Sequence, residues 1–150
     1  MLYEASLIKD GSLYKQFLGF LIKRGSKVKA KRILDEAFSF VTKKTKYSKQ
    51  VSLLLLFSTL NSFVEVKKVR VRRRFVLVPF PINLKRRSYV IVKWVMQSVD
   101  KDTKKSSFAN KLARELISIL KKNAFSKTKK LRRLNFSQAL ANRANTHFRW

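Results

Sequence analysis

Apolar residues recur along the chain at the three- and four-residue spacing of one face of an α-helix, and short basic or serine-led breaks separate the apolar segments. Serines stand at the start of several segments, where the side chains of Ser12, Ser48 and either Ser106 or Ser107 can cap a helix. The pattern predicts helices over residues 12–25, 26–41, 48–63, 84–99 and 107–120, and a sixth near the C-terminus that Asn135 caps.

The segment 48–63 differs from the others because it is apolar nearly all round. Such a segment is typical of a helix that other helices surround, so it is expected to be the central helix of a bundle. Its uncharged run, residues 50–64, contains Ser, Thr and Asn and is shorter than the roughly 20 apolar residues that a membrane span needs. The segment is therefore expected to be a buried helix and not a membrane span, and a membrane is not among the expected partners.

A different pattern begins at Val64, where the chain reads VEVKKVRVRRRFVLVPFPI. Basic and apolar residues alternate through residues 68–72, and this period of two is that of a β-strand. The alternation places Lys68, Arg70 and Arg72 on one face of the strand and the two valines between them on the other.

The run 75–78 is rich in β-forming residues and can return antiparallel to that strand, with Pro79 and Pro81 ending the pairing. The two strands predict a hairpin arm over about residues 64–82. The expected fold is mainly α, a bundle of about six helices with a protruding two-stranded β-hairpin arm, in a single domain over residues 1–150.

Charge changes the picture from fold to function. The chain of 150 residues has 36 Lys and Arg against 8 Asp and Glu, a formal net charge of +28. Self-repulsion of this size weakens a compact state unless an anion neutralises it, and nucleic acid is the commonest permanent polyanion. Two thirds of the basic residues follow residue 66, so most of the anion-binding surface is expected there.

The arm carries the most specific part of this signal, because six of the eight residues in 67–74 are Lys or Arg. One or two charges would protect the exposed edge of an ordinary hairpin from aggregation, and six exceed that need. We therefore expect the arm to contact phosphates.

Other basic residues cluster near residues 23–32, 85–87 and 121–133 and at the C-terminus. Arg can bind phosphate oxygens with both prongs of its guanidinium, and Lys acts more as a point charge. The terminal Trp150 can lie against RNA or fold back on the helices. The residues expected to bind RNA are Lys23, Arg24, Lys27, Lys29, Lys67, Lys68, Arg70, Arg72, Arg73, Arg74, Lys85, Arg86, Arg87, Lys130, Arg132, Arg133, Arg143, Arg149 and Trp150.

The residues needed for catalysis or metal binding are scarce. There is no Cys, and His147 is the only histidine, without the partners of a metal site or a catalytic triad. Asp35 and Glu36 are adjacent on a helix and face different directions, while Asp100 and Asp102 lie in a lysine-rich loop. We expect no enzyme activity, no metal and no cofactor, and a packing or hydrogen-bonding role for the histidine.

Two stretches resemble the small-subunit ribosomal protein seven family. The ending ANRANTHFRW is similar to the family's ending on Asn142, Arg143, His147, Phe148, Arg149 and Trp150. The stretch from Val64 to Trp94 is similar to it without gaps, on VEV at residue 64, Arg70, Val71, Val78, Pro79, Arg86, Arg87, Lys93 and Trp94. A third likeness lies at Ala30, Arg32, Ile33, Glu36 and Ala37.

The resemblance implies a bundle of about six helices with a protruding hairpin, bound to the 3′ major domain of small-subunit ribosomal RNA, where the protein nucleates assembly of the head. It implies that the hairpin and the terminal helix lie near the exit-site transfer RNA and the messenger RNA, beside ribosomal protein eleven. The matching positions expected to bind RNA are Arg70, Arg86, Arg87, Lys93, Arg143 and Arg149.

The hairpin departs from the family in one respect. The family commonly has a Gly-Gly pair where this chain has Arg72 and Arg73. Tight two-residue turns favour a positive φ, which Arg adopts poorly. The tip is therefore expected to be wider, or mobile until it meets RNA.

Three alternatives stay open from the residues. They are a general nucleic-acid compaction protein, a cationic protein of membrane surfaces, and an enzyme of phosphoryl transfer or hydrolysis. The high content of Lys, Phe and Leu with only 3 Gly and 2 Pro favours an AT-rich organellar genome, and so a mitochondrial ribosome over the bacterial cytoplasm or a plastid.

Overall fold

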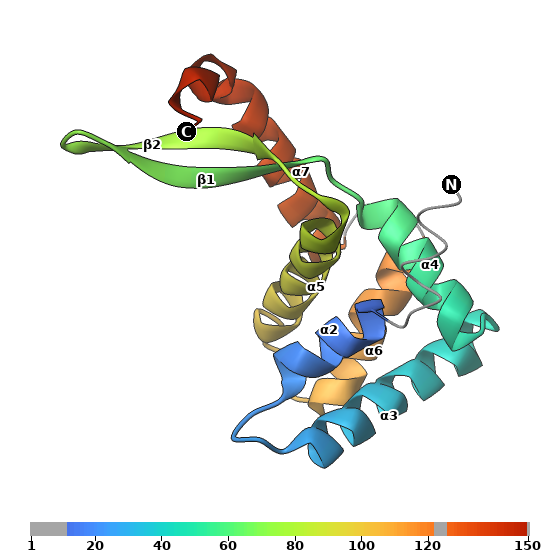
Figure 1. Ribbon diagram of the computed structural model, residues 1–150. Helices are drawn as coiled ribbons and strands as arrows, with labels where there is room; N and C mark the ends of the chain where they lie inside the picture. The colour runs from blue at the N-terminus through green and yellow to red at the C-terminus, as the bar shows by residue number, and fades with distance from the viewer. Residues whose placement is uncertain (1–11, 122–125, 150) are drawn as a thin grey trace.

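The protein is described by a computed structural model over residues 12–121 and 126–149. In this part of the chain, helices form a body from which a two-stranded arm projects (Figure 1). The elements are α2 (Ser12–Leu21), α3 (Lys27–Thr45), α4 (Lys49–Leu60), β1 (Val64–Val71), β2 (Arg74–Pro81), α5 (Leu84–Asp100), α6 (Phe108–Leu120), α7 (Lys127–Ala141) and the 3₁₀ helix η1 (Arg143–Phe148). The predicted fold class, mainly α with a hairpin arm, is confirmed.

The core of the body gathers around α5 and α6. Leu112, Leu116 and Ile119 of α6 are almost completely buried, as are Val92 and Val95 of α5. Helices α3, α4, α5 and α7 all contact α6, which therefore occupies the central place that the sequence had given to 48–63.

The expectation of a central helix at 48–63 is wrong. Helix α4 lies at the side of the body, and Val51 and Leu54 on its outer face are exposed (Figure 1). Only the face with Leu53, Leu56 and Phe57 is buried. A helix that is apolar all round can pack against others on one side only, and composition alone does not say how many neighbours it has.

Several helix ends follow the local signals. Ser48 and Ser107 cap α4 and α6, because their side chains accept hydrogen bonds from backbone N–H groups at distances of 3.3 Å. The first helix ends at Leu21, earlier than expected, and Arg24 and Gly25 then turn the chain with φ of 51° and 74°. The side chain of Ser12, the predicted first cap, lies outside the described part.

The last helix begins earlier than predicted. Helix α7 starts at Lys127, and Ser126 caps it by accepting a hydrogen bond from the N–H of Lys129. Asn135 lies in the middle of this helix, so the prediction that it is a cap is wrong. The segment 127–133 is dense in positive charge and shows no clear apolar stripe, but Lys and Arg are good helix formers, so the helix includes it.

A second, smaller apolar cluster lies at the foot of the arm. Ile82, Val90 and Trp94 are buried together, and Leu131 of α7 packs against them. Trp94 is thus a core residue on the buried face of α5. This cluster joins the end of β2 to α5 and α7, so the arm stands on a packed base.

Candidate nucleic-acid interface

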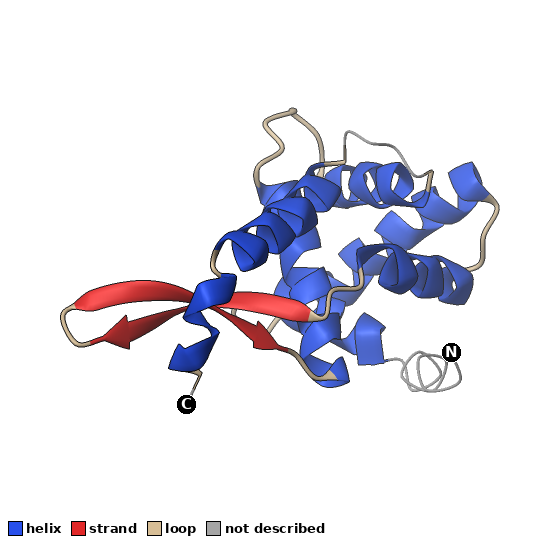
Figure 2. Cartoon of the chain, turned by 90° about the horizontal axis from the view of Figure 1, so that it is seen from above, coloured by secondary structure: helices blue, strands red, loops and turns tan. Residues whose placement is uncertain are grey.

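The two strands of the arm pair antiparallel from Val64 opposite Pro81 to Val71 opposite Arg74 (Figure 2). In this register Lys68 stands opposite Leu77, and Arg70 opposite Phe75. Residues directly opposite each other share a face of a sheet, so this face combines cationic and apolar side chains. The predicted placing of Lys68 and Arg70 on one face is confirmed, but Arg72, predicted to share that face, lies in the turn beyond the end of β1.

Pro79 lies inside the pairing, so the expectation that it ends the pairing is wrong, whereas Pro81 is the last paired residue of β2. The carbonyl oxygen of Leu77 faces away from β1, because it accepts a hydrogen bond from Asn145. Pro79 and Pro81 lie two and four residues after Leu77 on the same strand, so their backbones have the same orientation as that of Leu77. Their nitrogens therefore also face away from β1. A proline at such a position removes no hydrogen bond from the ladder.

The tip of the arm is a tight turn of two residues, Arg72 and Arg73, because pairing continues to Val71 and Arg74. Arg72 takes up the left-handed conformation with φ of 54°, and Arg73 does not. The expected wider tip is wrong. For a residue with a side chain the left-handed conformation costs about 1 kcal/mol, a cost small enough for the paired strands to impose.

The foot of the arm is held along both edges by the C-terminal part of the chain (Figure 2). On the β1 edge, Asn135 Nδ2 donates to the Val64 carbonyl oxygen at 2.8 Å, and the Val66 N–H donates to Asn135 Oδ1 at 3.4 Å. On the β2 edge, Asn145 Nδ2 donates to the Leu77 carbonyl oxygen at 3.1 Å. A side-chain amide offers both a donor and an acceptor, so one Asn can pair with an extended backbone.

Arg149 completes this clamp, because its Nε donates to the carbonyl oxygen of Pro79. Next to it, His147 Nδ1 donates to the Ala144 carbonyl oxygen at 2.9 Å, and its ring lies 3.8 Å from that of Phe148, centroid to centroid. The histidine thus has the packing and hydrogen-bonding role expected of it.

Three of the predicted RNA-binding arginines near the foot of the arm also make contacts inside the protein. The guanidinium of Arg86 pairs with Glu65. Arg87 Nε donates to the Ile82 carbonyl oxygen at 3.2 Å, and its guanidinium lies 4.2 Å from the centre of the Phe63 ring. Arg132 donates through Nε and Nη1 to two carbonyl oxygens at the end of α4, each at 3.1 Å. These arginines therefore stabilise the fold, in addition to the RNA binding that the sequence predicts for them.

The direction of α7 depends on a residue that the sequence did not single out. Glu115 Oε1 on α6 accepts hydrogen bonds from Ser126 Oγ at 2.7 Å, Thr128 N at 3.0 Å and Thr128 Oγ1 at 2.8 Å. The Thr128 hydroxyl lies 2.8 Å from that of Ser98 on α5. A carboxylate at a helix N-terminus also complements the helix dipole. Three helices meet here, and the junction sets where α7 carries its basic side chains.

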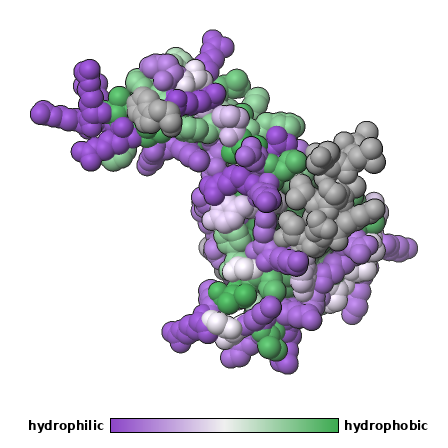
Figure 3. Space-filling model, in the orientation of Figure 1, coloured by the Kyte–Doolittle hydropathy of each residue, from purple (hydrophilic) through white to green (hydrophobic). Residues whose placement is uncertain are grey.

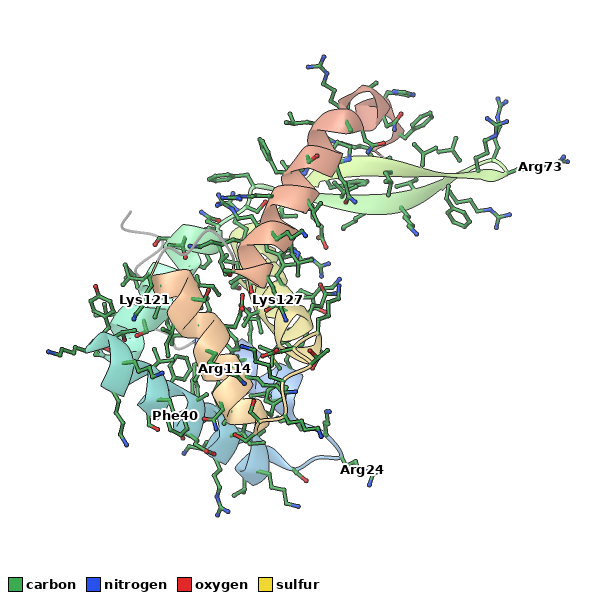
Figure 4. The ribbon with its side chains drawn as sticks, turned by 180° about the vertical axis from the view of Figure 1, so that it is seen from behind. Arg24, Phe40, Arg73, Arg114, Lys121 and Lys127 are labelled. Atoms are coloured by element: carbon green, nitrogen blue, oxygen red, sulfur yellow. The ribbon has the colours of Figure 1, made fainter. Side chains whose placement is uncertain are left out.

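The predicted RNA-binding residues cover the molecule from end to end. In Figure 4, Arg73 marks the tip of the arm and Arg24 marks the turn between α2 and α3 at the opposite end. Apart from the half-buried Arg87 and Lys93, those in the described part are exposed. Trp150 lies outside it. Figure 3 shows hydrophilic side chains over the arm and along much of the body.

The structure places the predicted residues in four groups. The arm carries Lys67, Lys68, Arg70, Arg72, Arg73 and Arg74; α5 carries Lys85, Arg86, Arg87 and Lys93; α7 and the C-terminal segment carry Lys130, Arg132, Arg133, Arg143 and Arg149; and the turn before α3 and its first residues carry Lys23, Arg24, Lys27 and Lys29. The first three groups meet around the arm, and the fourth lies apart from them (Figure 1).

Besides Glu65, two acidic residues of the described part form ion pairs with Lys or Arg. Asp102 lies 3.8 Å from Arg114 and 3.7 Å from Lys127, and Asp35 lies 2.7 Å from Lys49. Between residues 12 and 121 and again from 126 to 149, no three His, Cys, Asp or Glu residues gather in a group that could hold a metal ion. Over the same residues, no helix is long and apolar enough to cross a membrane.

This chain is similar to proteins of one known family over nearly its whole length. The sequence model of the family described as ribosomal protein S7p/S5e matches residues 3–143. The small ribosomal subunit protein uS7m of Reclinomonas americana is 26% identical over 147 residues, which cover 98% of this chain and 90% of that protein. The small ribosomal subunit protein uS7 of Thermomicrobium roseum is 32% identical over 143 residues, covering 95% and 90%. That of Polynucleobacter asymbioticus is 31% identical over 137 residues, covering 90% and 85%.

Proposed function

The chain belongs to the ribosomal protein S7p/S5e family, and we propose that it holds the 3′ major domain of small-subunit ribosomal RNA and nucleates assembly of the head. It is a structural protein of the small ribosomal subunit and not an enzyme. The observation that carries the proposal is the arm, whose foot is clamped by Asn135 and Asn145 while Arg72, Arg73 and Arg74 at its tip are exposed.

The proposed mechanism is phosphate neutralisation by a rigid frame. The buried core around α5 and α6 fixes the helices that carry cationic side chains relative to one another, so binding has to order only the side chains. The arm and the turn at Arg24 lie at opposite ends, so one protein can reach separate RNA helices and hold them together. Binding at both ends is what a nucleator of assembly needs.

The arm and the C-terminal segment are also proposed to lie near the exit-site transfer RNA and the messenger RNA, beside ribosomal protein eleven and other small-subunit proteins. Support comes from their arrangement, because Phe148 lines one hollow together with Val71, Val76 and the arginines of the tip. The C-terminal segment and the tip of the arm therefore lie side by side.

For the compartment we propose a mitochondrial ribosome. A relative named uS7m and the low Gly and Pro content support it, and relatives named uS7 from several bacteria support the bacterial alternative. Immunolocalisation in intact cells distinguishes the mitochondrial, plastid and bacterial alternatives.

The test of RNA binding is filter binding of the purified protein to the 3′ major domain RNA across a salt series. Each neutralised phosphate contributes about 0.7 to 0.9 to the slope of log affinity against log salt, so the affinity is expected to fall steeply. A flat response would contradict phosphate neutralisation. Competition with duplex DNA of equal length separates this function from general compaction, since a compaction protein would bind both equally.

A further inference from the structure

An apolar groove lies beside the arm, bordered by part of the cationic surface described above. Asn61, Ser62, Phe63 and Val64 form one wall, between α4 and β1, and Arg132, Arg133, Phe136, Ser137 and Leu140 of α7 form the other. Its volume is about 510 Å³, within the range of sites that hold small organic groups. Figure 3 shows hydrophobic side chains at this junction of arm and body, next to the hydrophilic arm.

Three large apolar side chains of the groove are exposed to solvent. Phe63, Phe136 and Leu140 are 63%, 59% and 54% exposed. The guanidinium of Arg87 lies over the Phe63 ring, 4.2 Å from its centre, and much of the ring remains open to solvent. Contiguous exposed apolar side chains with a polar rim mark binding sites more often than scattered ones do.

The rim of the groove is cationic. Arg132 and Arg133 line it, and the residues described along its walls include no Asp or Glu. Arg132 is fixed in place by its bonds to the carbonyl oxygens of Thr59 and Asn61. Positive charge beside flat apolar rings complements a ligand that joins an aromatic face to an anion.

We propose that this groove binds the base of an unpaired RNA nucleotide, stacked on Phe63 or Phe136, with a neighbouring phosphate at Arg133. The inference rests on the proposed RNA-binding function and names a different kind of contact, because the cationic faces bind phosphates of any sequence. Aromatic side chains are the usual platforms for unstacked bases, and each stack contributes strongly to affinity.

An apolar protein segment fits the charges less well. It would fill the space between the phenylalanines, but it would bring no anion to the two arginines at the rim and would remove water from them. A nucleotide supplies both the ring and the charge. Binding of a protein segment in the groove is the alternative that the experiment distinguishes.

The experiment compares full-length variants for binding to the 3′ major domain RNA. Phe136→Ala is expected to weaken binding between about five- and a hundredfold, because one base–aromatic stack is lost. The salt slope stays at its wild-type value, since a stack releases no counterions. Phe136→Trp is expected to keep the affinity, and RNA should quench the fluorescence of the added indole.

Leu134→Ala is the matched control. Leu134 lies on the same helix and is 48% exposed, and it does not line the groove. Its truncation is expected to leave RNA affinity unchanged. Thermal unfolding of each variant should match the wild type, because the substituted side chains are exposed. Ultraviolet crosslinking followed by mass spectrometry should find a nucleotide adduct on the peptide that holds Phe63 or Phe136.

Wild-type affinity in Phe136→Ala together with the absence of an adduct would overturn the proposal and leave the proposed function intact. Normal RNA affinity but loss of the variant from assembled subunits would overturn it in favour of a protein segment. Failure of the wild-type protein to bind the RNA at all would overturn the proposed function itself.

Discussion

Arg86 and Glu65 form a bidentate ion pair, with Nε 2.9 Å from Oε2 and Nη2 2.8 Å from Oε1. The pair joins the first turn of α5 to β1 near the foot of the arm. The hydrogen bond from Arg86 is the main cause that lowers the pKa of Glu65, and the same bond raises the pKa of Arg86. An arginine that the family motif assigns to RNA thus also braces the arm.

Replacing Glu65 by Gln is expected to lower the free energy of unfolding at pH 7 by about 1 kcal/mol, a modest value because the pair is partly exposed. The folded-state pKa of Glu65 is below its ordinary 4.5, so the pair stabilises the protein above pH 4.5. This contribution is lost as the pH falls through the folded-state pKa. Denaturant unfolding of both proteins at pH 7 and at several values below 4.5 checks it. A difference that does not change with pH would contradict the assignment.

Asn135→Ala should loosen the arm from α7. It removes the bond to the Val64 carbonyl and the weaker one from the Val66 N–H, and the expected loss is about 1 to 2 kcal/mol. Hydrogen exchange at the Val66 amide should become faster than in the wild type. Gln138→Ala, at an exposed position on the same helix, is the control and should leave that exchange unchanged.

Arg72→Gly should stabilise the arm, because Gly adopts the positive φ of this position without steric cost. The gain is expected to be about 0.5 kcal/mol, since the greater freedom of Gly in the unfolded chain offsets part of it. Arg73→Gly removes the same charge at a position without positive φ and should give no gain. Equal melting temperatures for the two variants would show that the turn is not strained.

Replacing Arg72, Arg73 and Arg74 together by Ala should reduce the salt slope of RNA binding by about two to three, at about 0.7 to 0.9 for each of three lost phosphate contacts. Thermal unfolding should change little, because the three side chains are exposed at the tip. A loss of thermal stability that accompanies the loss of RNA binding would mean that the three arginines of the tip are needed for the fold.

The control for that triple change removes three charges elsewhere. Lys31, Lys43 and Lys44 are exposed on α3, and none is among the residues proposed to bind RNA. Their replacement by Ala is expected to reduce the slope by less than the triple change at the tip does.

Glu115→Ala should be the most destabilising of these changes. It leaves the hydroxyls of Ser126 and Thr128, both buried, and the Thr128 N–H without their carboxylate acceptor, and the expected loss is about 2 to 4 kcal/mol. Glu36→Ala removes the same charge at an exposed position on α3 and should be nearly neutral. Chemical denaturation measures both.

Local patterns predicted the elements well where neighbours in sequence decide the structure. The alternation through residues 68–72 predicted a strand, and the serine caps at Ser48 and Ser107 are confirmed. The exposed outer face of α4 and the start of α7 were missed. Both depend on packing partners. Leu54 is exposed because no described helix covers it, and α7 begins where Glu115 of α6 accepts a hydrogen bond from the Thr128 N–H in its first turn.

By itself, the sequence determined the excess of positive charge, the helical and β periods and the family motifs, because all of these are properties of residue order. The tertiary structure decided which of the cations hold the protein together and which are left to face RNA. That choice rests on contacts between distant residues, such as Glu65 with Arg86, 21 positions apart, and Val64 with Asn135, 71 apart. Such contacts form only once the helices have packed and brought the two residues within hydrogen-bonding distance.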